Sequence, residues 1–96
     1  MTPSFDIAVV GATGTVGETI VQMLEEREFP VGKLHLLASS ESDGQSVPFR
    51  GKNVRVRDVD AFDFSSVQLA FFAAGPAVTL SFAAKASAAG CMVIDL

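Results

Sequence analysis

Tryptophan and tyrosine are absent from this 96-residue sequence, and cysteine and histidine occur once each. The single cysteine, Cys91, excludes an internal disulfide framework and fits a reducing, cytoplasmic compartment. Cys91 and the single histidine, His35, fall on different predicted strands, so they offer no cluster of metal ligands. We therefore expect no metal site.

Positive charge and long apolar runs are also scarce. The chain has 7 lysines and arginines against 11 acidic residues, a formal net charge of −4. This balance argues against nucleic acid and anionic membrane surfaces as partners, and the apolar runs are too short and interrupted to cross a bilayer. Apolar residues nevertheless make up 49% of the chain, so we expect part of the surface to be covered by something outside this sequence.

Glycine stands at three regularly spaced positions near the start of the chain. An apolar run at residues 7–10 leads into Gly11, Gly14 and Gly17, and a helix-like pattern follows at once. Strand, glycine turn and helix in this order predict a dinucleotide phosphate site, because the helix start presents unpaired N–H groups and partial positive charge. Gly11 would allow the tight turn, Gly14 the approach of the phosphate, and Gly17 close packing of the helix on the strand.

The rest of the chain alternates between strand and helix patterns. We expect parallel strands at 5–10, 34–38, 67–73 and 91–95, and helices at 15–28 and 77–89, the second closed by Gly90. Residues 39–46 read as a surface loop, residues 47–49 and 54–56 as a small hairpin, and residues 58–66 as a connection. The pattern predicts one α/β domain over residues 1–96, a Rossmann-like parallel sheet with helices on both faces. Because the last predicted strand ends the sequence, we expect a fragment of a longer two-domain chain.

Several collinear segments resemble the cofactor-binding part of the aspartate-semialdehyde dehydrogenase family. They are residues 11–17 (GATGTVG), 24–30 (LEEREFP), 36–39 (LLAS), 63–64 (DF), 70–75 (AFFAAG) and 88–95 (AAGCMVID). The resemblance implies NADP or NAD as cofactor, reduction of aspartyl phosphate through a cysteine thioester, and a homodimer formed through a C-terminal part outside this sequence. The small-molecule substrate would bind to that longer chain.

The resemblance also assigns site residues by position. Thr13, Gly14, Thr15 and Val16 would face the diphosphate and ribose, between Gly11 and Gly17. Ser39 and Ser42 would lie near the adenosine ribose or its 2′-phosphate, and Ala74, Gly75 and Thr79 on the nicotinamide side.

This sequence also departs from the family pattern. Glu41 stands where the family often has arginine; its carboxylate would repel a 2′-phosphate and favour NAD, or it would simply face solvent. Ala73, Pro76 and Leu96 replace residues that the family usually keeps small or polar. The pattern looks closest to the divergent Usg-like paralogues.

No residue of this sequence is predicted to be catalytic. Cys91 is expected to be a buried, structural thiol, because a nucleophilic cysteine needs a lowered pKa from a helix N-terminus or a histidine. His35 is expected to be structural, and Asp58, Asp60 and Asp63 to form a solvated connection. Two alternatives remain: a non-catalytic nucleotide-binding paralogue, and a short-chain-reductase-like or redox-sensing regulator that shares the GATGxxG turn.

Overall fold

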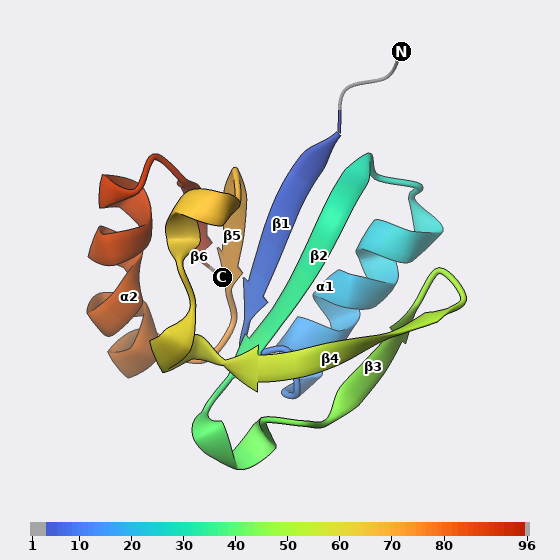
Figure 1. Cartoon of the computed structure of the whole chain (residues 1–96), viewed down its shortest axis with the longest axis horizontal. Helices are drawn as coiled ribbons and strands as arrows, with labels where there is room; N and C mark the ends of the chain where they lie inside the picture. The colour runs from blue at the N-terminus through green and yellow to red at the C-terminus, as the bar shows by residue number, and fades with distance from the viewer. Residues whose placement is uncertain (1–3, 96) are drawn as a thin grey trace.

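The computed structural model describes residues 4–95, apart from the side chain of Ser40, and folds them around one sheet (Figure 1). The strands are β1 (Phe5–Val10), β2 (Val31–Ala38), β3 (Ser46–Phe49), β4 (Lys52–Asp58), β5 (Leu69–Phe72) and β6 (Met92–Asp95). The helices are α1 (Thr15–Glu26) and α2 (Pro76–Ala88), with short 3-10 turns η1 (Ser40–Ser42), η2 (Val59–Ala61) and η3 (Phe64–Ser66). No helix in the described part of the chain is long and apolar enough to span a bilayer.

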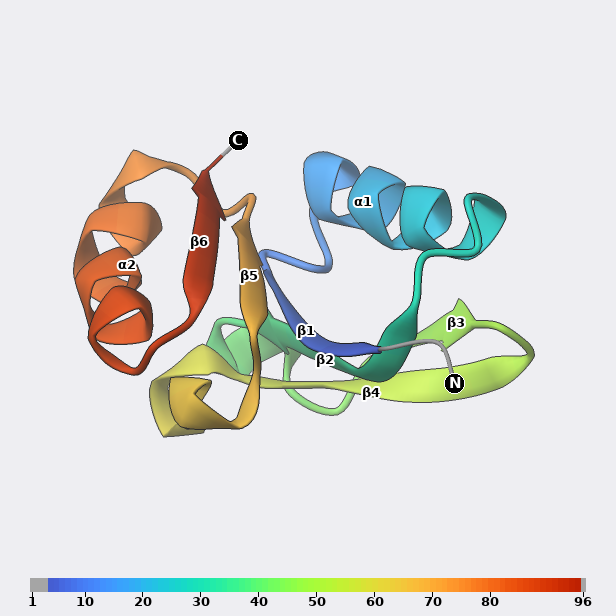
Figure 2. The ribbon, with the colours of Figure 1, turned by 90° about the horizontal axis from the view of Figure 1, so that it is seen from above.

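The sheet has the order β3-β4-β2-β1-β5-β6. Every pair is parallel except the antiparallel β3–β4 hairpin. From the central β1 the chain first adds β2 and β4 on one side, then β5 and β6 on the other, so the hairpin end and the β6 end lie far apart (Figure 2). The strand order therefore reverses between β1 and β5, which is where ligands bind in open α/β sheets.

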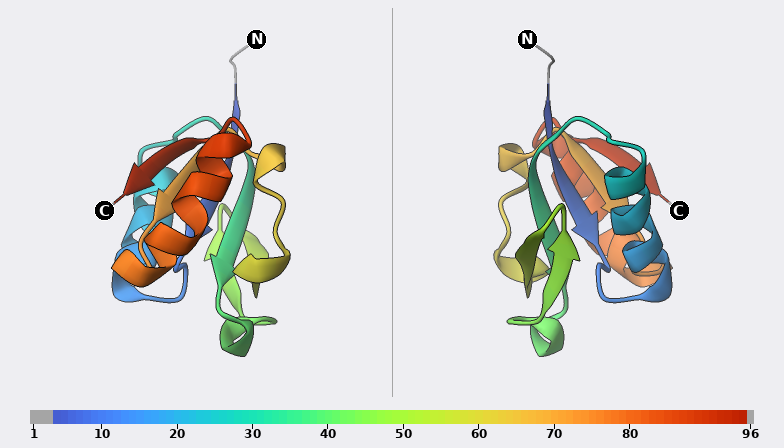
Figure 3. Two further views of the ribbon diagram at one scale, coloured as in Figure 1. Left: turned by 90° about the vertical axis from the view of Figure 1, so that its left-hand side faces the viewer. Right: turned by 90° about the vertical axis from the view of Figure 1, so that its right-hand side faces the viewer.

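The two helices cover opposite faces of the sheet, as the two views of Figure 3 show. On β1, Ile7 and Val9 pack with residues of α1, whereas Ala8 and Val10 pack with residues of α2. The alternation follows from the two-residue period of a strand, and the same rule sends Phe71 and Phe72 to opposite layers. The predicted Rossmann-like α/β class is confirmed.

Helix α1 buries part of the apolar stripe that helical spacing predicts at Val16, Ile20, Met23 and Leu24. Ile20 and Leu24 are buried, but Val16 is 51% and Met23 45% exposed. The buried positions are Gly17, Ile20, Val21 and Leu24. The helix also ends at Glu26 instead of residue 28, because Glu28 takes a left-handed backbone with φ of 51°.

The predicted hairpin forms, since β3 pairs antiparallel with β4, but its second strand also belongs to the main sheet, which the sequence did not predict. Strand β4 pairs in parallel with β2 through Leu36 and Val56, and Val56 is fully buried. Strand β2 is also longer than predicted, since Val31 pairs with Phe5 at the start of β1. The alternation of Val54 and Val56 with Arg55 and Arg57 is typical of a strand with one solvated face, which hid its parallel neighbour.

Strand β6 forms an edge of the sheet and is only half covered. Met92 is 64% exposed, and Val93 and Ile94 are half-buried. Leu80 on α2 is 82% exposed. We predicted that something outside this sequence covers part of the apolar surface, and for the exposed side chains of β6 and α2 this stays a prediction.

Candidate functional site

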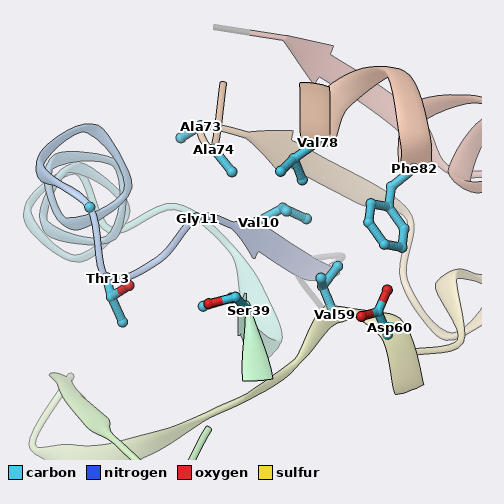
Figure 4. A pocket seen from close by; sticks show the side chains of 12 residues that line it. Val10, Gly11, Thr13, Ser39, Val59, Asp60, Ala73, Ala74, Val78 and Phe82 are labelled. Atoms are coloured by element: carbon cyan, nitrogen blue, oxygen red, sulfur yellow. The ribbon is translucent and has the colours of Figure 1, made fainter. Parts of the chain in front are cut away.

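A cleft of about 560 Å³ lies where β1, β2, β4 and β5 end. Its volume falls in the range of ligand pockets in proteins. Figure 4 shows Thr13 and Ser39 toward one end and Asp60 and Phe82 toward the other. The lining residues are Val10, Gly11, Thr13, Gly14, Ala38, Ser39, Val59, Asp60, Ala73, Ala74, Val78 and Phe82.

The floor of the cleft is the turn after β1. Gly11 has φ of +89°, in the left-handed region that glycine favours. Its N–H donates to the carbonyl of Leu37 at 2.8 Å. A Cβ at Gly11 would lie 2.8 Å from both the carbonyl carbon of Ala73 and the nitrogen of Ala74. The turn therefore requires glycine for its dihedral angle and for the close approach of the chain after β5.

Gly17 holds the start of α1 against this turn. A Cβ there would lie 2.1 Å from the Gly11 carbonyl oxygen. The close packing predicted for Gly17 is confirmed, although the contact is with the turn and not with the body of β1.

Gly14 is the N-cap of α1 and is exposed beside the cleft. Its carbonyl accepts the first helical hydrogen bond, from Glu18 N–H at 2.9 Å. The N–H groups of Thr15, Val16 and Gly17 come before that bond and have no hydrogen-bond partner among the described residues. No side chain caps this helix end, so its donors and its partial positive charge are left for a ligand.

The loop after β2 contributes hydroxyl groups. Ser39 lines the cleft, and the Ser42 hydroxyl lies 3.4 Å from the Thr13 hydroxyl. Glu41 is exposed on η1 and does not line the cleft. The predicted serines thus lie at or beside the cleft, and Glu41 is not among the residues that line it.

The segment after β5 is divided between cleft and helix. Ala73 and Ala74 line the cleft, and the N–H of Ala73 donates to Val10 at 2.8 Å. Gly75 and Thr79 do not line it. They are joined by a hydrogen bond from the Thr79 hydroxyl to the Gly75 carbonyl at 3.0 Å, in the first turn of α2. Leu96, also singled out in the sequence, lies outside the described residues.

Six lining residues were not identified from the sequence as cleft residues: Val10, Ala38, Val59, Asp60, Val78 and Phe82. Val59 and Asp60 follow β4, so recognising β4 as a parallel strand would have placed them at the carboxyl edge. Val78 and Phe82 lie four residues apart on α2 and share one helix face.

The two residues considered as reactive groups lie outside the cleft. Cys91 is only 6% exposed, and burial raises the pKa of its thiol, the opposite of what a nucleophile requires. His35 is half-buried against Phe62, with ring centroids 5.2 Å apart. Burial lowers the pKa of His35, outweighing the opposite effect of Asp6. Both residues read as structural.

The three acidic residues after β4 have separate surroundings. The Asp58 carboxylate accepts from Asp60 N–H, and the Asp63 carboxylate accepts from Ser65 N–H; the Ser65 contacts lower the pKa of Asp63. Within residues 4–95, no group of three or more histidine, cysteine or acidic side chains could hold a metal ion.

A glycine turn that enters a helix beside the reversal of a parallel sheet defines the dinucleotide-binding class of α/β domains. Comparison with known proteins narrows the class. A model of the family "semialdehyde dehydrogenase, NAD binding domain" matches residues 6–96. The chain belongs to this family.

Individual relatives share most of this chain but are much longer. A USG-1 protein homolog of Azotobacter vinelandii is 64% identical over 96 residues, which are 100% of this chain and 29% of that protein. An aspartate-semialdehyde dehydrogenase of Legionella pneumophila is 53% identical over 99% of this chain and 27% of its own length. The crystal structure of aspartate-semialdehyde dehydrogenase II of Vibrio cholerae, complexed with ASA, superposes with a TM-score of 0.95. It is 49% identical over 97% of this chain and 30% of that chain.

The packing of Gly17 yields a stability prediction with an unusual sign. Gly→Ala inside a helix normally stabilises by roughly 0.5–1 kcal/mol. We expect Gly17→Ala to destabilise by about 1–3 kcal/mol, because its methyl group overlaps the Gly11 carbonyl and forces the turn to shift. Gly14→Ser is the control, since a side chain there meets only ordinary contact at 3.5 Å and serine is a favourable N-cap. Urea denaturation followed by circular dichroism measures both, and a Gly17→Ala variant as stable as the wild type would contradict this packing.

Proposed function

We propose that the cleft binds a nicotinamide dinucleotide, with the diphosphate at the N-terminus of α1. The observation that carries this proposal is the first turn of α1. Three N–H groups without a protein partner among the described residues follow Gly14, which lines the cleft at the strand-order reversal. Unpaired helical N–H groups and the helix dipole both favour a bound anion.

The roles of the individual residues follow from their places around the cleft. Thr13, Gly14, Thr15 and Val16 would hold the diphosphate and adjoining ribose, while Gly11 and Gly17 keep the turn in shape. Ser39 and Ser42 would bind the adenosine ribose. Ala74 would line the nicotinamide side through its backbone, and Gly75 and Thr79, which lie just outside the cleft, would support that segment through the hydrogen bond between them.

The cofactor would be NAD(H) more readily than NADP(H), because of Glu41. Its exposed carboxylate follows Ser39 on η1, close to the ribose position just assigned. A carboxylate accepts hydrogen bonds from ribose hydroxyls and repels a 2′-phosphate.

For the complete protein we propose an oxidoreductase that acts on a small semialdehyde or acyl phosphate and works as a homodimer through parts outside this chain. Bound nicotinamide would supply hydride chemistry. The support is the family match and the 53% identity to an aspartate-semialdehyde dehydrogenase. The residues of this chain bind and orient the cofactor, and none of them would be the nucleophile or the base.

A second candidate is a nucleotide-binding paralogue without this activity. Two USG-1 protein homologs, at 64% and 58% identity, are more similar to this chain than the Legionella enzyme is. An activity assay of the complete protein distinguishes the two candidates. The protein is mixed with aspartate semialdehyde, phosphate and either NAD or NADP, and the absorbance at 340 nm is followed. Formation of NADH or NADPH supports the enzyme, whereas dinucleotide binding without turnover supports the paralogue.

A charge at Gly14 tests the proposed diphosphate site without harming the fold. Aspartate is a strong N-cap, so we expect Gly14→Asp to keep or raise the free energy of unfolding. Its carboxylate would occupy the place of the diphosphate, and we expect it to weaken NADH binding at least about ten-fold.

Gly14→Ser is the uncharged comparison: its hydroxyl fills the same space and accepts from the same N–H groups, so we expect it to weaken NADH binding less than Gly14→Asp does. Isothermal titration calorimetry of the full chain with NADH measures both variants. Equal affinities of Gly14→Asp and Gly14→Ser for NADH would show that the diphosphate lies elsewhere.

Reversing the charge at Glu41 tests the cofactor preference. We expect Glu41→Arg to shift the ratio of NADPH to NADH affinity by about ten-fold toward NADPH, because guanidinium binds phosphate strongly. Glu26→Arg, which changes the net charge equally at the far end of α1, should leave the ratio unchanged. An unaltered ratio in Glu41→Arg would mean that Glu41 only faces solvent.

A further inference from the structure

His35 lies under the segment that forms one wall of the cleft. Residues 59–66, which include the turns η2 and η3, lie between β4 and β5 and bring Val59 to the same end of the cleft as Phe82 (Figure 4). Phe62 of this segment packs on the His35 ring, with centroids 5.2 Å apart. The Phe62 N–H donates to the Val59 carbonyl at 3.2 Å. The one histidine of the sequence therefore contacts a residue that is hydrogen-bonded to the cleft wall.

A row of aromatic rings continues from Phe62 into the core. Phe62 meets Phe64 edge-on at 5.1 Å, and Phe64 lies 6.4 Å from Phe82 on α2. Phe64 is 1% exposed and also stacks on Phe72 of β5 at 6.1 Å. The inner end of the 59–66 segment is thus fixed in the core, whereas Phe62 is only half-buried. The segment is held at its outer end by the contact of Phe62 with His35.

A positive charge on the His35 ring would disfavour this contact. Burial lowers the pKa of His35, and the cations of Lys33 on β2 and Arg57 on β4 lower it further, against the opposing effect of Asp6 on β1. The surroundings of the ring in the closed arrangement therefore favour neutral imidazole.

The acidic side chains of the 59–66 segment do not cover the ring. Asp60 and Asp63 are exposed, and the Asp63 carboxylate accepts from the N–H and the hydroxyl of Ser65 at 3.0 and 2.7 Å. The group of this segment that packs on His35 is the uncharged ring of Phe62. Its π electrons would attract an imidazolium, so a measured pKa decides which effect prevails.

We propose that protonation of His35 opens the η2 side of the cleft, so that the protein binds dinucleotide less tightly in acid. The cationic ring would draw water under Phe62, and the outer end of the 59–66 segment would move away from the sheet together with Val59. The effect on affinity rests on the proposed function, whereas the opening itself needs no ligand.

The direction of the effect follows from the two states of the segment. Under Phe62 the pKa of His35 lies below its ordinary value of 6.5, and in the hydrated, open state it would return toward that value. The closed state is therefore fully favoured above pH 6.5 and loses stability as the pH falls below it. At one pH unit below that value, protonation lowers the ratio of closed to open states by at most about ten-fold.

The first measurement is the pKa of His35 by NMR of the full chain, using the imidazole signals that a His35→Phe variant lacks. We expect a pKa below the ordinary 6.5. Arg57→Gln should raise it, because a nearby cation is removed, whereas Arg27→Gln makes the same change of charge at the end of α1 and should leave it unchanged. A wild-type pKa at or above 6.5 would overturn the proposal.

The second measurement detects the opening through hydrogen exchange of the Phe62 amide, which bonds to Val59. Wild type and His35→Phe are compared at the same pH, so the intrinsic pH dependence of exchange cancels. Between about pH 7.5 and 5.5, we expect the wild-type rate to rise relative to the variant by at most about ten-fold.

His35→Leu is a second uncharged variant and should follow His35→Phe. Circular dichroism establishes that each variant is folded at both pH values. A ratio of exchange rates that does not change with pH would overturn the opening.

Calorimetry with NADH at the same two pH values tests the regulation of the proposed site. We expect the wild type to lose several-fold more affinity on acidification than His35→Phe does. Equal losses would overturn the role of His35 and leave dinucleotide binding intact. A folded chain whose Phe62 exchange responds to His35, but which binds NADH at neither pH, would overturn the proposed function and the effect on affinity while the opening stands.

Discussion

The structure depends on backbone packed directly against backbone at Gly11. On one side, Gly11 contacts the backbone at the peptide bond between Ala73 and Ala74. On the other side, the Gly11 carbonyl lies beside the α carbon of Gly17. Because no side chain stands between these segments, the end of β1, the start of α1 and the end of β5 meet at one point. Any larger residue at Gly11 or Gly17 would push them apart.

Neighbouring interactions fix this point in the sheet. The Gly11 N–H bonds to Leu37 on β2, and the Ala73 N–H bonds to Val10 on β1, each at 2.8 Å. The apolar cores on both faces of the sheet enclose β1, whose residues Ile7, Ala8 and Val9 are fully buried. The floor of the cleft is therefore set by backbone geometry, while its walls consist of side chains from later loops.

Local patterns predicted the elements near this turn well. The apolar run of β1, the three glycines and Gly90 after α2 act through local backbone geometry, so the sequence reveals them directly. Strand β4 was harder, because its partner β2 is distant in sequence and its alternating valines and arginines fit a hairpin equally well. Asp60 was missed for the same reason, since only the parallel pairing of β4 places η2 at the cleft.

The exposure of Val16 and Met23 shows a second limit of sequence patterns. Helical spacing identified Ile20 and Leu24 on the buried side of α1, but Gly17 and Val21 share that side, and Gly17 packs against the turn at Gly11. A residue without a side chain adds nothing to an apolar pattern, so the sequence could not show that this side of the helix faces the turn.

The most direct measurement is a titration of the ¹⁵N-labelled full chain with NADH, followed by amide chemical shifts. If the first turn of α1 binds the diphosphate, the largest changes in chemical shift are expected for the amides of Thr15, Val16 and Gly17. Saturable binding that leaves these three amides unmoved, or no binding by the folded chain, would contradict the account.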